Sequence, residues 1–103
     1  MKRIRVLVDS SGAEVYRVEG QNNIKILEKE IDFAGNYTKS RGLNFNDEEA
    51  LVRFLERLVA NYFDYSVEAY AGGIFSELGD HEIGDLLKEV KKRARIELVV
   101  VKN

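Results

Sequence analysis

Among the acidic side chains, Asp9 stands where a carboxylate could do chemistry, at the end of a predicted strand. Residues 3–9 alternate apolar and polar side chains and then run apolar, with Leu7 adding to the second face, which predicts a buried strand. Two-metal catalysis uses several clustered carboxylates, yet the strand predicted at 66–71 ends in alanine and glycine without a partner acid. We therefore expect Asp9 to cap the turn at 10–12, and we keep it as a weak catalytic candidate.

Two further positions carry weak signals. Gly72 and Gly73 lie between a predicted strand and a predicted helix, where backbone amides can meet an anion. Neither a Gly-Lys-Ser/Thr sequence nor G-x-G-x-x-G accompanies them, so a tight exit from the strand explains them equally well. His81, the one histidine, has no neighbours at metal-ligand spacing. We expect no metal and no cofactor.

Basic side chains gather in two places that could contact phosphates. Residues 35–44 lack any period and carry Tyr37, Lys39 and Arg41, which suit stacking on bases and phosphate contacts, although a plain surface connection has the same composition. The second group lies near the end of a predicted helix and consists of Lys88, Lys91, Lys92 and Arg95. The last three follow Lys88 by 3, 4 and 7 residues, so all four share one face of the helix. These cations either complement the helix dipole or form a phosphate-contacting patch.

Aromatic side chains are close together near the end of the first predicted helix and along the next strand. If several are exposed together, they mark a protein interface, and a homodimer is the simplest form of it. The candidates are Tyr62, Phe63, Tyr65 and Tyr70.

Composition excludes several classes of protein. The chain of 103 residues is expected to form a single domain, 1–103. It has no cysteine, which excludes disulfides, thiolate metal sites and a cysteine nucleophile. The net charge of −2 is unlike that of a general nucleic-acid binder. No apolar run is long enough for a membrane span, and no secretory signal is visible, so we expect a cytoplasmic protein that does not bind membranes.

Periodicity and turn signals predict a β-β-β-α-β-α-β order. The two amphipathic stripes predict helices, the first capped at Asn46 and the second at Asp80. Strands are predicted at 3–9, 13–19, 24–31, 66–71 and 96–101. Crossovers are right-handed, so the strands form a mixed five-stranded sheet covered by helices. This α/β layout is that of the ribonuclease-H-like fold and of half an actin-like ATPase.

One stretch resembles the second domain of the class-one archaeal and eukaryotic release factors and Pelota, a group that includes release-factor-like and host-attachment-type proteins. It is the sequence VLVDSSGAEVY at 6–16, followed by the long segment 32–46 and by the small residues 71–73. Release factors carry Gly-Gly-Gln in the long loop, where this chain has Lys39-Ser-Arg-Gly42. The resemblance therefore implies a Pelota-like role, with a basic loop near RNA and no hydrolysis.

Three other stretches resemble the N-terminal half of the exopolyphosphatase and guanosine-pentaphosphatase family. They are GLNFNDEEA at 42–50, AYAGGIFSEL at 69–78 and RIELVVV at 95–101. That family has Asp-Ile-Gly-Ser-Asn where this chain has the five residues 9–13, Asp-Ser-Ser-Gly-Ala. Such enzymes work in the cleft between two lobes, so this resemblance implies a phosphate-handling half-domain that needs a partner lobe.

The hypothesis from sequence is a catalytically silent domain that binds RNA or a ribonucleoprotein through the loop at 35–44 and the basic helix end. The alternative is a protein-interaction or assembly module, with a homodimer as its simplest form. The third hypothesis is the phosphate-handling half-domain.

Overall fold

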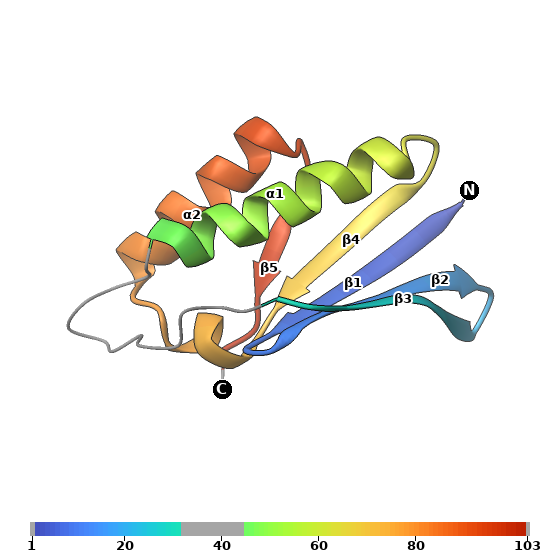
Figure 1. The fold of residues 1–103 in the computed structure, drawn as a ribbon, viewed down its shortest axis with the longest axis horizontal. Coiled ribbons are helices and arrows are strands. Elements are labelled where there is room, and N and C mark those ends of the chain that lie inside the picture. Colours follow the sequence, from blue (N-terminus) through green and yellow to red (C-terminus); the bar gives the residue numbers. More distant parts are fainter. Residues whose placement is uncertain (1, 32–44, 103) are drawn as a thin grey trace.

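A computed structural model describes residues 2–31 and 45–102, with the side chains of 45 and 46 left out. The described elements confirm the β-β-β-α-β-α-β order, with one short 3₁₀ helix added before the second α-helix (Figure 1). They are β1 Arg3–Asp9, β2 Gly12–Glu19, β3 Asn22–Glu30, α1 Phe45–Asn61, β4 Ser66–Ala71, η1 Gly73–Glu77, α2 Asp80–Arg93 and β5 Leu98–Val100.

The five strands form one mixed sheet in the order β3-β2-β1-β4-β5. The β1–β2 and β2–β3 pairs are antiparallel, while β1–β4 and β4–β5 are parallel. Both α-helices lie on the same side of this sheet (Figure 1). The α/β class and the mixed five-stranded sheet expected from the sequence are therefore confirmed. None of the helices in the described ranges is long and apolar enough to cross a membrane.

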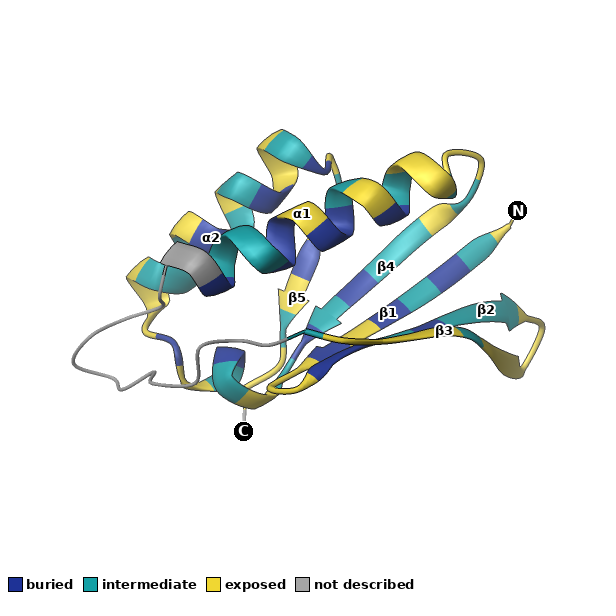
Figure 2. Ribbon diagram, in the orientation of Figure 1, coloured by how far each residue is buried: buried dark blue, intermediate teal, exposed yellow. Residues whose placement is uncertain are grey.

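The core lies between the helices and one face of the sheet. Along β1, Ile4, Val6 and Val8 are buried, and the residues between them are not, which gives the alternation visible in Figure 2. Leu7 is 42% exposed. The first strand was predicted to be buried on both faces, and that prediction is wrong, because no described element covers the face of the sheet opposite the helices.

Several element boundaries differ from the predicted ones. The last strand covers Leu98–Val100 instead of 96–101, because Arg95 takes a left-handed backbone conformation with φ 60° where the chain turns from α2 into β5. The second helix is capped by Gly79, and Asp80 is the first residue of its first turn, where a negative charge favours the helix dipole.

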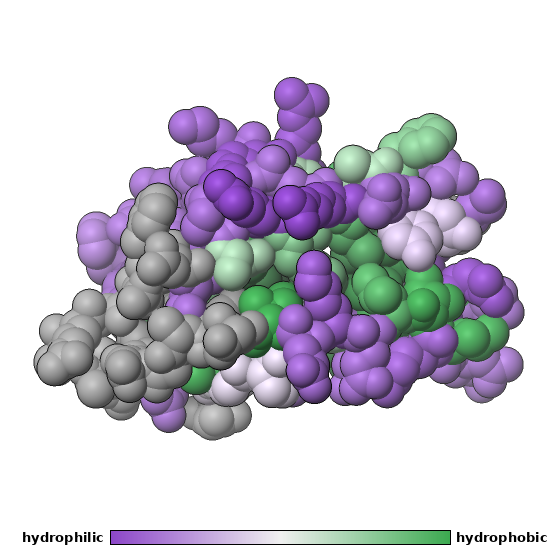
Figure 3. All heavy atoms as spheres, in the orientation of Figure 1, coloured by the Kyte–Doolittle hydropathy of each residue, from purple (hydrophilic) through white to green (hydrophobic). Residues whose placement is uncertain are grey.

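Hydrophobic surface remains visible between α1 and the β2–β3 hairpin (Figure 3). On β3, Ile24 and Leu27 are each 39% exposed. The ammonium of Lys29, on the same strand, lies 5.9 Å from the ring centroid of Phe54 on α1. The hairpin is thus joined to the helix layer more loosely than β1 and β4 are.

An ionic cluster joins the two helices. Arg93 on α2 donates to both carboxylate oxygens of Glu49 on α1, at 2.6 and 2.8 Å, and its guanidinium lies 2.5 Å from Glu56. Arg53 adds a bond of 3.1 Å to Glu49. These donors, Arg93 first, lower the pKa of Glu49 from 4.5 to about 2. Arg93, which lies between Lys92 and Arg95 in the sequence, is therefore used to hold α2 against α1.

Replacing Arg93 with Gln should lower stability at neutral pH and flatten its acid dependence. Because the folded-state pKa of Glu49 is depressed, its contribution is present above pH 4.5 and is lost as pH falls towards about 2. Urea midpoints measured across that range should therefore fall less steeply in Arg93→Gln than in the parent chain. Arg57→Gln, at an exposed position on α1, is the control and should keep the parent slope. Parallel profiles for the parent and Arg93→Gln would contradict the assignment.

Candidate functional site

The carboxyl ends of β1 and β4 lie next to each other at the centre of the sheet. The two strands are parallel, and Val8 pairs with Ala71 just before both strands end. From β1 the chain continues to β2 on one side, whereas from β4 it continues to β5 on the other. In open α/β sheets, ligands bind in the crevice outside the carboxyl ends of strands at such a switch point. Asp9 and the Gly72-Gly73 pair, singled out from the sequence, both lie here.

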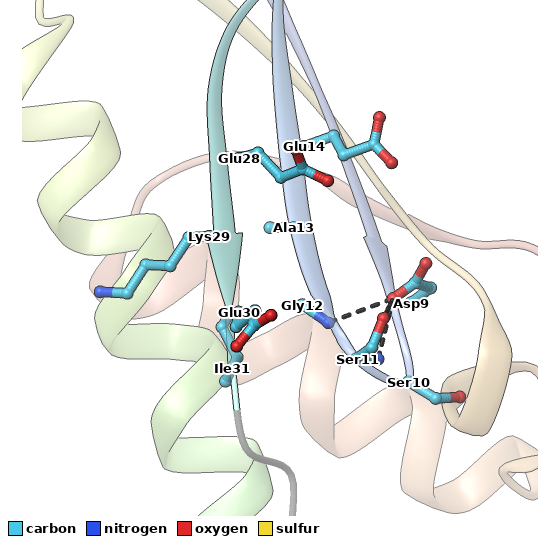
Figure 4. A pocket seen from close by; sticks show the side chains of 10 residues that line it. All are labelled: Asp9, Ser10, Ser11, Gly12, Ala13, Glu14, Glu28, Lys29, Glu30 and Ile31. Atoms are coloured by element: carbon cyan, nitrogen blue, oxygen red, sulfur yellow. Dashed lines mark hydrogen bonds between the residues drawn. The ribbon is translucent and has the colours of Figure 1, made fainter.

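The β1–β2 turn is built around the carboxylate of Asp9. Its Oδ1 atom accepts hydrogen bonds from the Ser11 amide at 2.8 Å, the Ser11 hydroxyl at 2.9 Å and the Gly12 amide at 3.1 Å (Figure 4). These bonds lower the pKa of Asp9, and the Ser11 backbone amide is the largest cause. Asp9 therefore stays ionised and caps the turn. Two backbone donors that could hold a foreign anion are already occupied by its carboxylate.

The turn after β4 is locked onto the β1–β2 turn. The backbone amide of Ile74 donates to Ser10 Oγ at 2.9 Å. Gly73 has φ +59°. A Cβ at this position would lie only 2.6 Å from the backbone nitrogen of Ser10 and would collide with it. The next residue but one, Phe75, is fully buried and anchors the 3₁₀ helix in the core. The two turns thus form one rigid surface.

An open cavity of about 980 Å³ adjoins the β1–β2 turn and the end of β3. The Lys29 side chain points towards α1 and away from the lining carboxylates (Figure 4). Lys25 lies 3.3 Å from Glu14 and 3.8 Å from Glu28 and offsets part of their charge. The described residues that line the cavity are Asp9, Ser10, Ser11, Gly12, Ala13, Glu14, Glu28, Lys29, Glu30 and Ile31. Four of these are acidic and one is a lysine, so the cavity is negative overall.

The negative charge limits what the cavity can hold. A bare phosphate would be repelled by the surrounding carboxylates, whereas a phosphate that carries a divalent cation would not. Within residues 2–31 and 45–102, no three acidic or histidine side chains are arranged to hold a metal ion by themselves. A cation here would therefore be shared between the chain and its ligand. Ser10 Oγ accepts from Ile74, which leaves the hydroxyl hydrogen to donate to a ligand.

None of the described residues expected to contact RNA lines this site. Tyr37, Lys39 and Arg41 lie outside the described residues. Lys88 and Lys91 line a separate groove between α2 and β5. The remaining two members of the basic helix end, Lys92 and Arg95, are exposed. Since α2 runs back against the strand direction, its end lies at the opposite end of the sheet from Asp9 (Figure 1).

The four aromatic candidates do not form one surface either. The rings of Tyr62 and Tyr65 are partly buried and pack edge to face, with centroids 5.4 Å apart. Phe63, between them, is 84% exposed. Tyr70 pairs with Leu7 near the other end of β4. His81 is exposed and lies 3.4 Å from Asp85, one helical turn away.

Comparisons with known proteins bear on the fold. No protein-family model and no curated protein matches the sequence. Among solved structures, an Aquifex aeolicus Ppx/GppA phosphatase is similar with a TM-score of 0.71 and 15% identity over 99% of this chain. An exopolyphosphatase from Cytophaga hutchinsonii has a TM-score of 0.72 and 10% identity over 99% of the chain. An exopolyphosphatase-like protein reaches 0.75, with 8% identity over 97%.

The chain has the ribonuclease-H-like fold. It covers 36%, 34% and 32% of those three proteins, about a third of each. At these identities the likeness establishes the fold alone.

The comparisons correct the functional hypothesis drawn from the sequence. The similar structures are exopolyphosphatase-type proteins, and a non-catalytic RNA- or ribonucleoprotein-binding role is contradicted. The release-factor resemblance finds no support, whereas the competing exopolyphosphatase resemblance does. Sequence reasoning missed the acidic wall of Glu14, Glu28 and Glu30. Glu14 on one predicted strand, and Glu28 and Glu30 at alternate positions on the next, could have indicated an acidic face.

Replacing Gly73 with Ala should destabilise the chain by about 2–4 kcal/mol, through the left-handed backbone and the overlap with Ser10. Gly20 is a matched control, because its φ is +58° and a Cβ there meets nothing within 4 Å. Gly20→Ala should lower the free energy of unfolding by about 1 kcal/mol, because it adds the strain of a left-handed backbone but no steric overlap. Denaturant unfolding measures both. Equal losses in the two variants would show that the two turns can separate freely.

Proposed function

We propose that this domain is one lobe of a phosphate-handling protein of the actin-like type. It binds a phosphoanhydride, together with a divalent cation, at the carboxyl ends of β1 and β4. The observation that carries the proposal is the hydrogen bond from the Ile74 amide to Ser10 Oγ, which joins the two turns at the switch point. The likeness to exopolyphosphatases of the same fold supports this class of ligand.

Each polar group at the joined turns has a role in the proposed binding. One oxygen of Asp9 is held by the turn, which directs the carboxylate and keeps it charged. Its second oxygen accepts hydrogen bonds from water bound to the cation. The Ser10 hydroxyl donates to a phosphate oxygen. The acidic wall excludes phosphates that arrive without a cation.

A second lobe belongs to the proposal. The chain spans about a third of the proteins that share its fold. The cavity beside Asp9 is open, so one lobe can position a ligand without enclosing it. Hydrolysis would need groups that approach the ligand from the opposite side and exclude bulk water. The domain alone should therefore bind phosphates and hydrolyse them slowly or not at all.

Amide NMR titration with tripolyphosphate tests the binding site residue by residue. In the presence of Mg²⁺, the amide signals of Ser10 to Gly12 and of Gly72 to Ile74 should shift together. Without Mg²⁺ these shifts should be much smaller, because the carboxylates repel the bare anion. The Asp9→Asn variant should lose the part of the amide shifts that depends on Mg²⁺. Asp64→Asn is the control, since this exposed carboxylate pairs with Lys2 far from the joined turns.

The titration also has an outcome that would overturn the proposal. Tripolyphosphate is a polyanion, and Lys88 and Lys91 attract it without any specific site. Shifts confined to α2 and independent of Mg²⁺ would mean that the joined turns bind no phosphate.

A further inference from the structure

A groove of about 390 Å³ runs between α2 and the edge strand β5, separate from the site at Asp9. Its floor is apolar and includes Leu87, Ile96 and Leu98. Its rim includes Lys88 and Lys91 from α2. Beyond the groove, where β5 ends, Lys102 lies 3.4 Å from Asp80 and donates to the Leu78 carbonyl at 3.1 Å. These contacts tie the end of β5 to the start of α2.

The backbone of β5 has hydrogen-bonding groups on its outer side. The strand pairs with β4 on one side and is the last strand in the order β3-β2-β1-β4-β5. The amide of Val101 donates to the Ala71 carbonyl at 2.8 Å. Because ladder bonds alternate along a strand, the N–H and C=O groups of Leu98 and Val100 point away from β4. They can pair with one more strand.

Gly84 lies one turn before Leu87 and Lys88 on the face of α2 that borders this groove. Gly84, Leu87, Lys88 and Lys91 follow the i, i+3, i+4, i+7 spacing and share one face of α2. Glycine inside a helix is destabilising relative to alanine. Among the described residues, a Cβ at Gly84 would meet nothing within 4 Å, so no close approach within that part of the chain requires the glycine. Its absence of a side chain leaves room for the side chain of a bound segment.

Charge selects the kind of segment that fits. Lys88 and Lys91 are exposed on the rim, and the one acid there, Glu97, lies 3.9 Å from Lys91. Exposed Lys92 and Arg95 add positive charge near the same end of α2. The groove is thus apolar at the bottom and positive at the edge. A segment whose helix-facing side chains include both apolar and acidic residues matches both features, because every second side chain of a strand points to the same face of the sheet.

We propose that β5 and the adjacent groove bind an extended acidic segment of a partner protein, which adds as a sixth strand to the sheet. Main-chain bonds to Leu98 and Val100 hold the segment in register. Its apolar side chains enter the groove beside Gly84, and its carboxylates meet Lys88 and Lys91. This places the basic helix end, singled out from the sequence, in a protein-binding surface. The proposal does not depend on phosphate binding at Asp9.

A second copy of the chain is a poorer occupant of the same edge. Pairing of two β5 strands about a two-fold axis would bring the two α2 helices to the same side of the seam. The Lys88 and Lys91 side chains of both copies would then face each other, and like charges at an interface are repulsive. The partner is therefore a segment with the opposite charge.

Binding is measured with fluorescent peptides of about six residues, the usual length of a strand. The test peptide carries both valine and glutamate at the alternate positions that share one face, and the comparison peptide has lysine in place of each glutamate. Fluorescence anisotropy should show binding of the glutamate peptide alone. Hydrogen exchange supplies an internal control. The amides of Leu98 and Val100 should exchange more slowly in the complex, whereas that of Val101, already bonded to Ala71, should not change.

Variants distinguish binding in the groove from nonspecific electrostatic binding. The double variant Lys88→Glu and Lys91→Glu should weaken binding at least tenfold, and so should Gly84→Leu, which places a large side chain one turn from Leu87 and Lys88 in the path of the bound segment. The folding of Gly84→Leu can be checked by its thermal midpoint, since a Cβ at this position has open space. Arg57→Glu changes charge at an exposed site on α1 and should leave the affinity unchanged.

Four results would overturn the proposal. One is the absence of binding by the glutamate peptide at about 1 mM. A second is that the lysine peptide binds as tightly as the glutamate peptide. A third is that the groove variants bind the glutamate peptide with the affinity of the parent chain. The last is self-association of the chain that protects Leu98 and Val100 without any peptide, which would make a second copy the occupant.

Discussion

The parallel pairing of β1 with β4 is the constraint on which the rest of the structure depends. It brings the end of the first strand and the end of the fourth, more than sixty residues apart in the chain, to one edge of the sheet. The pairing is held from the helix side by the apolar side chains of both strands, and the crossover through α1 makes it possible. Without it, the Asp9 turn would be an ordinary hairpin turn. With it, that turn is joined to the start of η1, and two separate loops become one surface.

The two ends of the sheet differ in charge and in the groups that they expose. The end at Asp9 is negative and rigid, and its donors are mostly occupied by the protein itself. The other end, where α2 finishes and β5 begins, is positive and apolar and has unpaired strand-edge groups. The small net charge of −2 conceals this separation.

Periodicity was sufficient to predict the element order, because each element has one strongly apolar face. Ile4, Val6 and Val8 mark the buried face of β1, and the stripe on α1 matches them. Gly12 and Gly73 could be recognised as turn residues, but the sequence does not contain the reason for them. Each is required by the close approach of a segment from elsewhere in the chain, Lys29 for one and Ser10 for the other. Exposure of Leu7 was likewise beyond prediction, since an apolar residue in a strand does not reveal whether a second layer covers it.

The functional hypothesis from sequence was wrong for a related reason. Lysines in a helix look alike whether they bind a nucleic acid, cap a helix or line a groove. The fold separates them: Arg93 holds α1, while Lys88 and Lys91 border β5. The aperiodic stretch that carries Tyr37, Lys39 and Arg41 lies outside the described residues. The acidic wall, by contrast, is spread over β2 and β3 and becomes a cavity only once those strands pair.

The central claim is that the joined turns bind a phosphate through the Ser10 hydroxyl. Calorimetric titration of Ser10→Ala with the Mg²⁺ complex of tripolyphosphate tests it most directly, with Ser10→Thr as the variant that keeps the hydroxyl. Loss of a hydrogen bond to a charged group should weaken binding about tenfold or more in Ser10→Ala, and Ser10→Thr should restore most of the affinity. Equal affinity in the parent chain and Ser10→Ala would contradict the account.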